Sequence, residues 1–321
     1  MNGIGGYFEL ELPFYDNMPN KHLMRVNSGR HALEYILRAI GVENIKILYV
    51  PKYTCDVVVE SIQRLPDVKW AFYNIDTNLE IDRIPQLADG EYIIVNNYFG
   101  IKDKYIDLIV EKFPKNVILD NSQALYYPAA KGIKSFYSPR KFVGVPDGGL
   151  ANIDTRIDSL DVGTSWHRCS HLLKRIDVGS EFGYADFREN SSGLKNEPVM
   201  HMSNLTSRML QGIDFSLVRE VRCRNYDILC AGLDVYNLLP TPYSTDIYCP
   251  MVYPFRTCNP AIRSRLLANR IFVAKYWPNV LDWCNYGEIE WHLTEEILPL
   301  PVDQRYTTDD MNNILELILE N

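Results

Sequence analysis

The stretch Val117-Ile118-Leu119-Asp120 and the later stretch Ser135-Phe136-Tyr137-Ser138-Pro139-Arg140-Lys141 decide how this chain is interpreted. Three apolar residues before an acid predict a buried strand that ends in Asp120. The second stretch places Lys141 on a serine-containing turn. If the strands form a parallel sheet, polar residues at their carboxyl ends lie where ligands bind. An acid and a lysine at that edge together indicate a site for chemistry.

This pair of residue types suits one cofactor, pyridoxal phosphate. Lys141 can form a Schiff base with the cofactor aldehyde, and Asp120 can keep its pyridine nitrogen protonated so that the ring accepts electrons. The neighbouring aromatic residues Phe136 and Phe142 favour a desolvated pocket, in which a lysine becomes a better nucleophile. Each residue also has an ordinary interpretation. Lys141 could be a solvated surface lysine, and Asp120 could be a turn residue.

Ser28-Gly29-Arg30 provides a candidate phosphate site. Ser28 is a typical N-cap, and a helix N-terminus offers free N–H groups and the positive end of the helix dipole. Ser135 and Ser138 could add hydroxyl groups to the same phosphate, and Gln123 could donate to the phenolic oxygen of the cofactor. The alternatives are an ordinary capping serine and a solvent-facing amide.

Strand and helix patterns alternate between residues 28 and 153, which predicts βαβ units and a largely parallel sheet flanked by helices. We expect helices at 29–40, 55–64 and 103–113, and strands at 45–50, 70–73, 92–95 and 117–120. Further along, we expect a polar loop at 186–202, a long helix from about 204, a strand at 251–253 and a final helix capped near Thr308. The predicted domains are a cofactor-binding α/β domain at 1–215, with an arm at 1–25, and a smaller α+β domain at 216–321.

Composition narrows the class of protein. A net charge of −8 and a pI near 5.3 argue against a nucleic-acid surface, which needs clustered Lys and Arg. The sequence contains no apolar run of about 18 residues, so we expect no membrane span. The N-terminus lacks the basic start and apolar stretch of a signal peptide. The 7 scattered cysteines indicate reduced thiols in a cytoplasmic protein.

Two other kinds of site are disfavoured. His167, Cys169 and His171 have metal-ligand spacing, but no further ligand cluster accompanies them, so no metal is expected. A serine hydrolase is disfavoured because the chain has no Gly-x-Ser-x-Gly motif.

In order and spacing, these stretches resemble the DegT-type sugar aminotransferases, a branch of the fold-type I pyridoxal-phosphate enzymes. The similar stretches are 27–33, 50–54, 96–100, 120–124 and 135–149. They correspond to the family motifs Ser-Gly-Thr-x-Ala-Leu, Pro-x-x-Thr, His-x-x-Gly, Asp-Ala-Ala-Gln-Ala and Ser-Phe…Lys…Asp-Gly-Gly. The resemblance implies a fold-type I homodimer that transfers an amino group, from glutamate or a similar donor, to a nucleotide-linked keto sugar.

The resemblance also assigns roles to residues. It makes Lys141 and Asp120 catalytic and gives Gln123 the phenolic oxygen. It places the remaining cofactor-binding residues around the phosphate: Ser28, Gly29, Arg30, Ser135, Ser138 and Asn204. Within this group, Asn204 is expected to reach the cofactor phosphate of the partner subunit.

The chain departs from the family in several ways. Arg30 replaces the threonine of the first motif, the interval from Asp120 to Lys141 is shorter than usual, and the chain is short overall. Ser135 lies six residues before Lys141 where the family has five, so strict spacing would put Arg140 in the lysine's place. We assign Lys141, because arginine cannot form the Schiff base and Ser138 gives a Ser-x-x-Lys spacing. Cys55 stands where an aromatic side chain often stacks on the cofactor, so Tyr98 or another ring could replace it. Two alternatives follow: a degenerate binding or assembly protein, and a sibling sugar dehydratase, in which the lysine is usually replaced.

Overall fold

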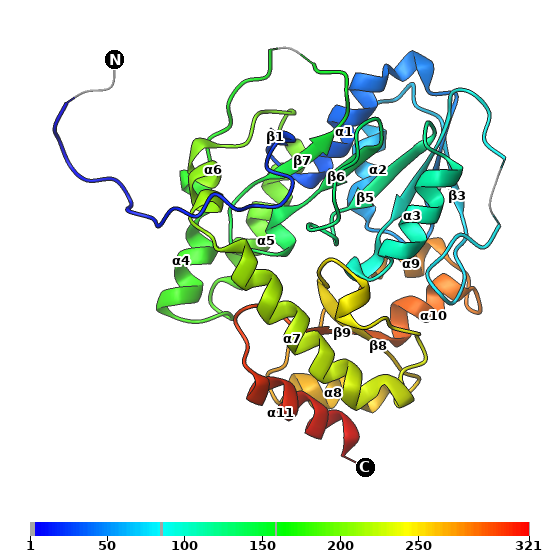
Figure 1. Cartoon of the computed structure of the whole chain (residues 1–321), viewed down its shortest axis with the longest axis vertical. Helices are drawn as coiled ribbons and strands as arrows, with labels where there is room; N and C mark the ends of the chain where they lie inside the picture. Colours follow the sequence, from blue (N-terminus) through cyan, green and yellow to red (C-terminus); the bar gives the residue numbers. More distant parts are fainter. Residues whose placement is uncertain (1–3, 84–85, 158, 321) are drawn as a thin grey trace.

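The computed structural model describes residues 4–83, 86–157 and 159–320. At its centre is a seven-stranded sheet with the strand order β1-β7-β6-β5-β4-β2-β3 (Figure 1). The strands are β1 (Met24–Val26), β2 (Ile47–Pro51), β3 (Trp70–Tyr73), β4 (Glu91–Asn96), β5 (Val117–Asn121), β6 (Lys134–Tyr137) and β7 (Gly149–Asn152). Strands β2 to β6 are parallel, whereas β7 is antiparallel to both of its neighbours. The prediction of a mostly parallel sheet is confirmed.

Helices cover both faces of this sheet because its central strands are apolar on both sides. In β4, Ile94 packs on one face and Val95 on the other. The helices α1 (Gly29–Ile40) and α2 (Asp56–Gln63) join the cluster that contains Ile94. The helix α3 (Asp103–Lys112) joins the cluster that contains Val95. The three helices agree with the predicted ones to within about one residue at each end.

Helix α1 shows why the local prediction succeeds. The Ser28 side chain accepts a hydrogen bond from the backbone N–H of His31, which satisfies one N–H of the first turn. Gly41 follows the last residue of the helix with φ of 87°, a backbone conformation that glycine adopts readily. Start and stop signals therefore lie where the sequence placed them.

The second half of the chain forms a smaller body below the large sheet (Figure 1). Strands β8 (Val252–Arg256) and β9 (Ile297–Pro301) pair antiparallel. Its helices are α7 (Phe215–Leu233), α8 (Pro260–Ala268), α9 (Pro278–Trp283), α10 (Ile289–Glu296) and α11 (Thr308–Leu319). Thr307 caps α11 through a reciprocal pair of hydrogen bonds with Asp310, as expected for a helix that begins near Thr308.

Two element predictions need correction. The stretch 186–202 was expected to be a loop, but α5 (Tyr184–Gly193) covers its first half after the preceding helix α4 (Ser170–Asp177). Most side chains of α5 are exposed, so the sequence shows no apolar stripe that would reveal a helix. The long helix expected from 204 is two helices, α6 (Asn204–Gln211) and α7, because Asp214 caps a new helix by accepting from Ser216 N and Leu217 N. The proposed domain boundary at 215 falls at the start of α7 and stays a prediction.

The first described residues form an extended arm that crosses the surface to reach α6 (Figure 1). The N–H groups of Tyr15 and Asp16 both donate to the carbonyl oxygen of Gln211. Several large apolar side chains of the arm are exposed: Tyr7, Phe8, Leu10 and Phe14. In the described part of the chain, no helix is long and apolar enough to cross a membrane.

Candidate active site

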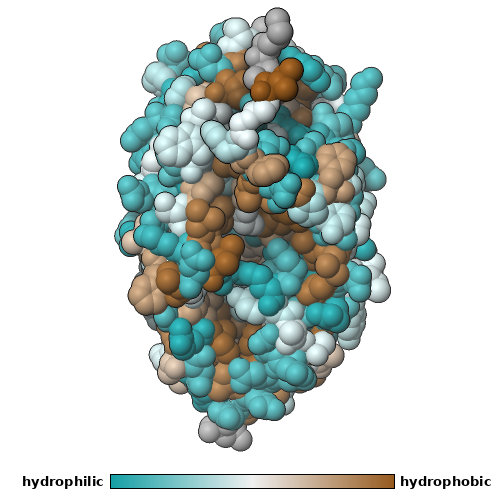
Figure 2. All heavy atoms as spheres, turned by 90° about the vertical axis from the view of Figure 1, so that its left-hand side faces the viewer, coloured by the Kyte–Doolittle hydropathy of each residue, from teal (hydrophilic) through white to brown (hydrophobic). Residues whose placement is uncertain are grey.

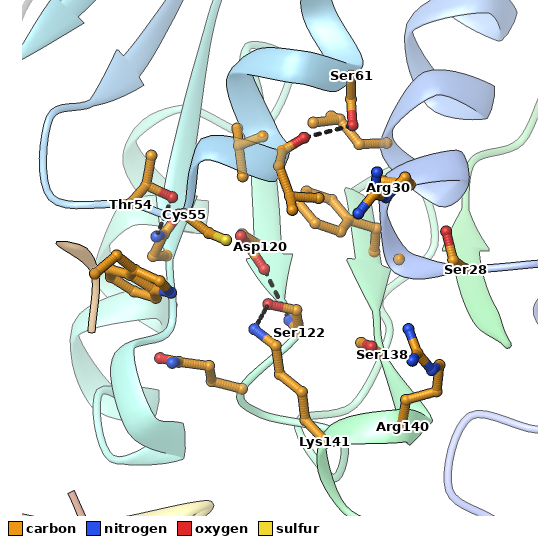
Figure 3. A pocket seen from close by; sticks show the side chains of 18 of the residues that line it. Ser28, Arg30, Thr54, Cys55, Ser61, Asp120, Ser122, Ser138, Arg140 and Lys141 are labelled. Carbon is orange, nitrogen blue, oxygen red and sulfur yellow. Dashed lines mark hydrogen bonds between the residues drawn. The ribbon is translucent and has the colours of Figure 1, made fainter. Parts of the chain in front are cut away.

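One pocket lies at the carboxyl ends of the parallel strands and brings most of the predicted residues together (Figure 3). Its cavity volume is about 230 Å³. Asp120 near the end of β5, Thr54 after β2 and Ser138 after β6 all line it. Among the predicted residues, those that line the pocket are Ser28, Gly29, Arg30, Asp120, Gln123, Ser138 and Lys141. The expected strand-end location of the site is therefore observed.

Lys141 and Asp120 are joined through Ser122 at one end of the pocket. The Lys141 Nζ donates to Ser122 Oγ at 2.9 Å, and the backbone N–H of Ser122 donates to Asp120 Oδ1 at 2.8 Å (Figure 3). Lys141 ends a short 3-10 turn, Pro139–Lys141, which carries its side chain over the strand ends. The sequence predicted Lys141 and Asp120, and the structure adds the serine between them.

The expectation of a desolvated lysine is wrong, because Lys141 is exposed at the pocket. The aromatic neighbours that suggested desolvation leave Lys141 exposed. Phe142 is buried with its ring centroid 4.7 Å from the Arg222 guanidinium, and Phe136 packs in the sheet core beneath α1. Neither ring therefore encloses the Lys141 ammonium group.

Asp120 is a buried carboxyl group. Burial raises the pKa of Asp120, and the Lys141 charge and the hydrogen bonds from Ser122 oppose that increase. Among the described residues only Ser122 donates to it, and that bond is to Oδ1. A cationic donor in the pocket would favour the charged form of the acid.

Gln123 presents an unused donor to the same pocket. Its Oε1 accepts from the backbone N–H of Phe99 at 2.8 Å, which fixes the orientation of the amide. The Nε2 is buried and has no hydrogen-bond partner in the described part of the molecule. A buried donor without a partner is costly, so a ligand oxygen at this position would stabilise the site.

Ser28 lines the other end of the pocket, but its hydroxyl proton is already used. The Nε2 of His31 lies 2.9 Å from the Glu197 carbonyl oxygen, so Nε2 must carry the ring proton and donate it there. The Nδ1 of His31 is then an acceptor, and Ser28 Oγ at 2.7 Å must donate to it. Burial lowers the pKa of His31 to about 4, which keeps this arrangement in place at neutral pH. The Ser28 hydroxyl is therefore not free to donate to an anion, whereas the backbone N-terminus of α1 remains available to one.

Ser138 approaches this helix N-terminus closely. A Cβ added at Gly29 would lie 3.2 Å from the Ser138 Cβ and 3.5 Å from its Oγ. The Ser138 hydroxyl lines the pocket, and no other described residue forms a hydrogen bond with it. Glycine at 29 thus allows a free hydroxyl group and the α1 N-terminus to face the same space.

Ser135 and Asn204 do not line the pocket. The Ser135 Oγ contacts the Tyr137 hydroxyl at 3.2 Å, because successive residues of β6 point to opposite faces and Phe136 takes the pocket side. Asn204 is the exposed first residue of α6, and Ser203 is the residue that caps this helix. Within one chain, Ser138 rather than Ser135 is placed to meet a phosphate.

Among the lining residues that the sequence did not assign to the site are Arg140 and Trp277. In the sequence, Arg140 stood out only because it occupies the position where the family spacing would put the lysine. Trp277 comes from the C-terminal half and had no local signal, whereas Tyr98, the ring first considered for stacking, is buried and does not line the pocket. Cys55 lines the pocket, and burial raises its pKa to about 12, so its thiol stays protonated.

The turn that carries Lys141 is tied to the C-terminal half. The carbonyl oxygen of Phe142 accepts from Arg222 Nη2 at 3.0 Å and from Gln304 Nε2 at 2.9 Å. Arg222 is buried in α7 and also donates to the Met251 carbonyl oxygen at 2.8 Å. Residues distant in sequence therefore help to set the position of the lysine.

The metal-like spacing at 167–171 does not form a ligand cluster. His171 packs against Phe187 with ring centroids 5.7 Å apart. Among the described residues, the group of potential ligands close enough to share an ion is Cys284, Glu288 and Glu290. Glu288 there already pairs with Lys52 at 2.5 Å.

We compared the sequence and the structure with those of known proteins. No protein-family model matches the sequence, and no curated protein matches it. A DegT DnrJ EryC1 StrS aminotransferase from Brucella abortus is 17% identical with a TM-score of 0.61, over 93% of this chain and 85% of the other. A Streptococcus pneumoniae protein described as a sugar aminotransferase, in its PMP form, is 16% identical with a TM-score of 0.63, over 95% and 88%. NtdA from Bacillus subtilis with bound cofactor PMP is 15% identical with a TM-score of 0.63, over 92% and 72%.

The chain has the fold of these aminotransferases. The resemblance drawn from the sequence motifs is thus confirmed for the fold. The residues of the pocket also fit pyridoxal phosphate. A buried acid, a lysine, the orphaned Gln123 Nε2 and a helix N-terminus are the groups needed for its pyridine nitrogen, aldehyde, phenolic oxygen and phosphate.

Proposed function

We propose that this protein is a pyridoxal-phosphate-dependent aminotransferase. The observation that carries the proposal is the hydrogen-bonded series Lys141–Ser122–Asp120 at the carboxyl ends of parallel strands. A lysine for the Schiff base and a buried acid for the pyridine nitrogen are the protein groups that this chemistry requires, and Ser122 contacts both. When bound, pyridoxal phosphate supplies an electrophilic carbon and an electron sink.

The residues divide the work as follows. Lys141 would hold the cofactor through its Nζ and would move a proton at that atom as a general base. Ser122 holds that Nζ at the pocket. Asp120 holds a proton on the pyridine nitrogen, and Gln123 Nε2 donates to the phenolic oxygen. The N-terminus of α1 and Ser138 bind the phosphate.

For the substrates we propose glutamate or a similar amino donor and a nucleotide-linked keto sugar as acceptor. The support is the similarity in fold to proteins described as sugar aminotransferases. In the absence of acceptor, glutamate should be converted to 2-oxoglutarate in an amount equal to the protein. If no amino acid is converted in this single turnover, the donor part of the proposal is wrong.

The decisive experiment is a test of Lys141. Purified protein mixed with pyridoxal phosphate should become yellow, and borohydride reduction with peptide mapping should place the label on Lys141. Lys141→Ala should lose the label and lower turnover by about 10³-fold or more, because the positioned nucleophile and base are gone. The matched control is Lys131→Ala, a change at an exposed lysine outside the pocket, which should keep both. A label on another lysine, or no colour, would contradict the proposal.

We also propose that the functional unit is a homodimer. Exposed apolar side chains lie on the arm and around α4 and α5, and Figure 2 shows apolar groups gathered along that side of the molecule. Those on α4, α5 and the residues between them include Leu173, Ile176, Phe182, Tyr184 and Phe187. Patches of this kind mark interfaces between proteins. Asn204 is exposed on α6 near the arm, where a partner subunit could meet it.

Sedimentation should therefore show a dimer that loses cofactor when it dissociates on dilution. Asn204→Ala should increase cofactor release without changing the absorption spectrum of the bound fraction. A stable monomer with full cofactor occupancy would rule out the shared site.

A further inference from the structure

Three arginines lie around the phosphate end of the pocket, and they differ in how their charges are satisfied. Arg30 pairs with Glu60 at 3.4 Å and donates to the Ser191 carbonyl oxygen at 3.5 Å. Arg168 pairs with Glu197 at 2.6 Å. Arg140, by contrast, makes neither a hydrogen bond nor an ion pair with any described residue, and its Nε is buried without a partner. Of these three arginines, Arg140 is the one without a partner among the described residues.

The surroundings of Arg140 make this lack of a partner costly. Burial and the nearby charges of Arg30 and Arg168 lower the pKa of Arg140, which is about 10, so the group stays charged at neutral pH. The acid that acts on it, Asp147, is already occupied. Its carboxylate accepts from Ser203 Oγ at 3.0 Å and from the Thr206 hydroxyl. A half-buried cation among other cations, whose buried Nε has no acceptor among the described residues, favours binding of an anion.

The position of Arg140 indicates where that anion sits. Arg140 lines the pocket beside Ser138 and faces Ser28 at the start of α1 (Figure 3). The Ser28 hydroxyl is committed to His31, as shown above, so this end has fewer hydroxyl donors than the sequence suggests. The Arg140 guanidinium, which lies at this end of the pocket, can take the place of the Ser28 hydroxyl as a donor to the anion.

We propose that Arg140 binds the phosphate group of the cofactor and supplies the positive charge that neutralises it. The inference rests on the proposed function and adds a residue that the family motifs do not provide. The spacing departure in this chain then has a physical meaning, because the extra residue before Lys141 is the phosphate-binding arginine. A phosphate monoester carries about −1.5 to −2 charges at neutral pH, more than one donor carboxylate. It therefore suits a site built from a guanidinium, a hydroxyl group and a helix N-terminus.

The experiment compares two aldehydes that differ only in the phosphate. Binding of pyridoxal phosphate and of pyridoxal is measured by visible absorption for the wild type and for Arg140→Met. We expect Arg140→Met to weaken pyridoxal phosphate binding by about 30-fold or more, the loss typical of a charge-assisted hydrogen bond. Pyridoxal binding should change by less than about twofold, because pyridoxal has no phosphate for the arginine to bind.

Two further variants complete the design. Arg140→Lys keeps the charge but not the forked geometry, so it should recover part of the lost affinity. Arg83→Met removes a guanidinium whose side chain is 95% exposed, and it should leave both affinities unchanged. Thermal unfolding of each variant checks that the fold is retained.

The outcomes separate the two proposals. If the wild type binds neither aldehyde on Lys141, the proposed function fails and this inference fails with it. If the wild type binds both and Arg140→Met weakens both equally, or neither, the phosphate assignment alone is wrong. If Arg140→Met leaves both aldehydes unaffected but raises the glutamate concentration needed for half-saturation, the arginine binds the donor carboxylate and the inference is overturned.

Discussion

The two ends of the pocket differ in how their charged groups are paired. At the lysine end, the charges of Lys141 and Asp120 face each other through Ser122, so the protein itself supplies cation, anion and bridge. At the arginine end, Arg140 has no acceptor among the described residues. The first end is organised before any ligand arrives, whereas the second reaches electrostatic balance only with an anion. Binding of that anion relieves the unfavourable free energy of the unpaired arginine, and this relief adds to the affinity for the anion.

Removing the acid should break the lysine end with the largest effect. Asp120→Asn keeps an oxygen for the Ser122 N–H but cannot hold a proton on a pyridine nitrogen. Turnover should fall by about 10²-fold or more, the range for one positioned acid–base group. Cofactor attachment to Lys141 should persist, as measured by absorption and borohydride labelling. Turnover close to that of the wild type would mean that Asp120 is only a strand-end residue.

The arginine end should show a pH-dependent stability that depends on His31. Its folded pKa of about 4 lies below the ordinary value of 6.5, so stability is complete above pH 6.5 and is lost as the pH falls to about 4. The difference of about 2.5 units corresponds to about 3 kcal/mol. His31→Gln should remove that part of the slope in urea unfolding measured from pH 7 to 4. His167→Gln, a change at an exposed histidine, is the control, and identical slopes for both variants would exclude a buried neutral His31.

The smallest expected effect concerns Ser135 and Ser138, which the sequence analysis assigned to the same phosphate. Ser138→Ala removes a hydroxyl group from the pocket and should weaken pyridoxal phosphate binding about tenfold, the loss of one hydrogen bond to a charged group. Ser135→Ala should leave binding within about twofold, since its hydroxyl contacts Tyr137 away from the pocket. Equal losses from the two variants would contradict the orientation of β6. Equilibrium titration followed by absorption provides the measurement.

Short-range sequence patterns predicted the helices that have capping residues and the strands that are continuously apolar. Ser28 and Gly41 bound α1, and alternating apolar segments gave the parallel strands and the acid at the end of β5. Helix α5 escaped prediction because an exposed helix has no apolar stripe. At the site, Lys141, Asp120 and Gln123 were predicted from motif spacing, and the structure brings the three side chains to one pocket.

The features of the site that the sequence did not predict depend on contacts between residues that are far apart in the chain. Trp277 joins the pocket from the other half of the chain, and no nearby pattern announces it. The Ser28 hydroxyl donates to His31 because the Glu197 carbonyl oxygen fixes the tautomer of the imidazole ring. Glu197 is far from both residues in sequence. The importance of Arg140 likewise depends on which acids are already occupied, a question of contacts and not of spacing.

The Phe142 carbonyl group gives the chain a long-range dependence. A polypeptide that ends at residue 215 would retain every residue assigned to cofactor chemistry, yet it would lack both Arg222 and Gln304, the two donors to that carbonyl oxygen. Its lysine would sit on an untethered turn. The C-terminal part of the chain would thus position the lysine without contributing a reactive group of its own.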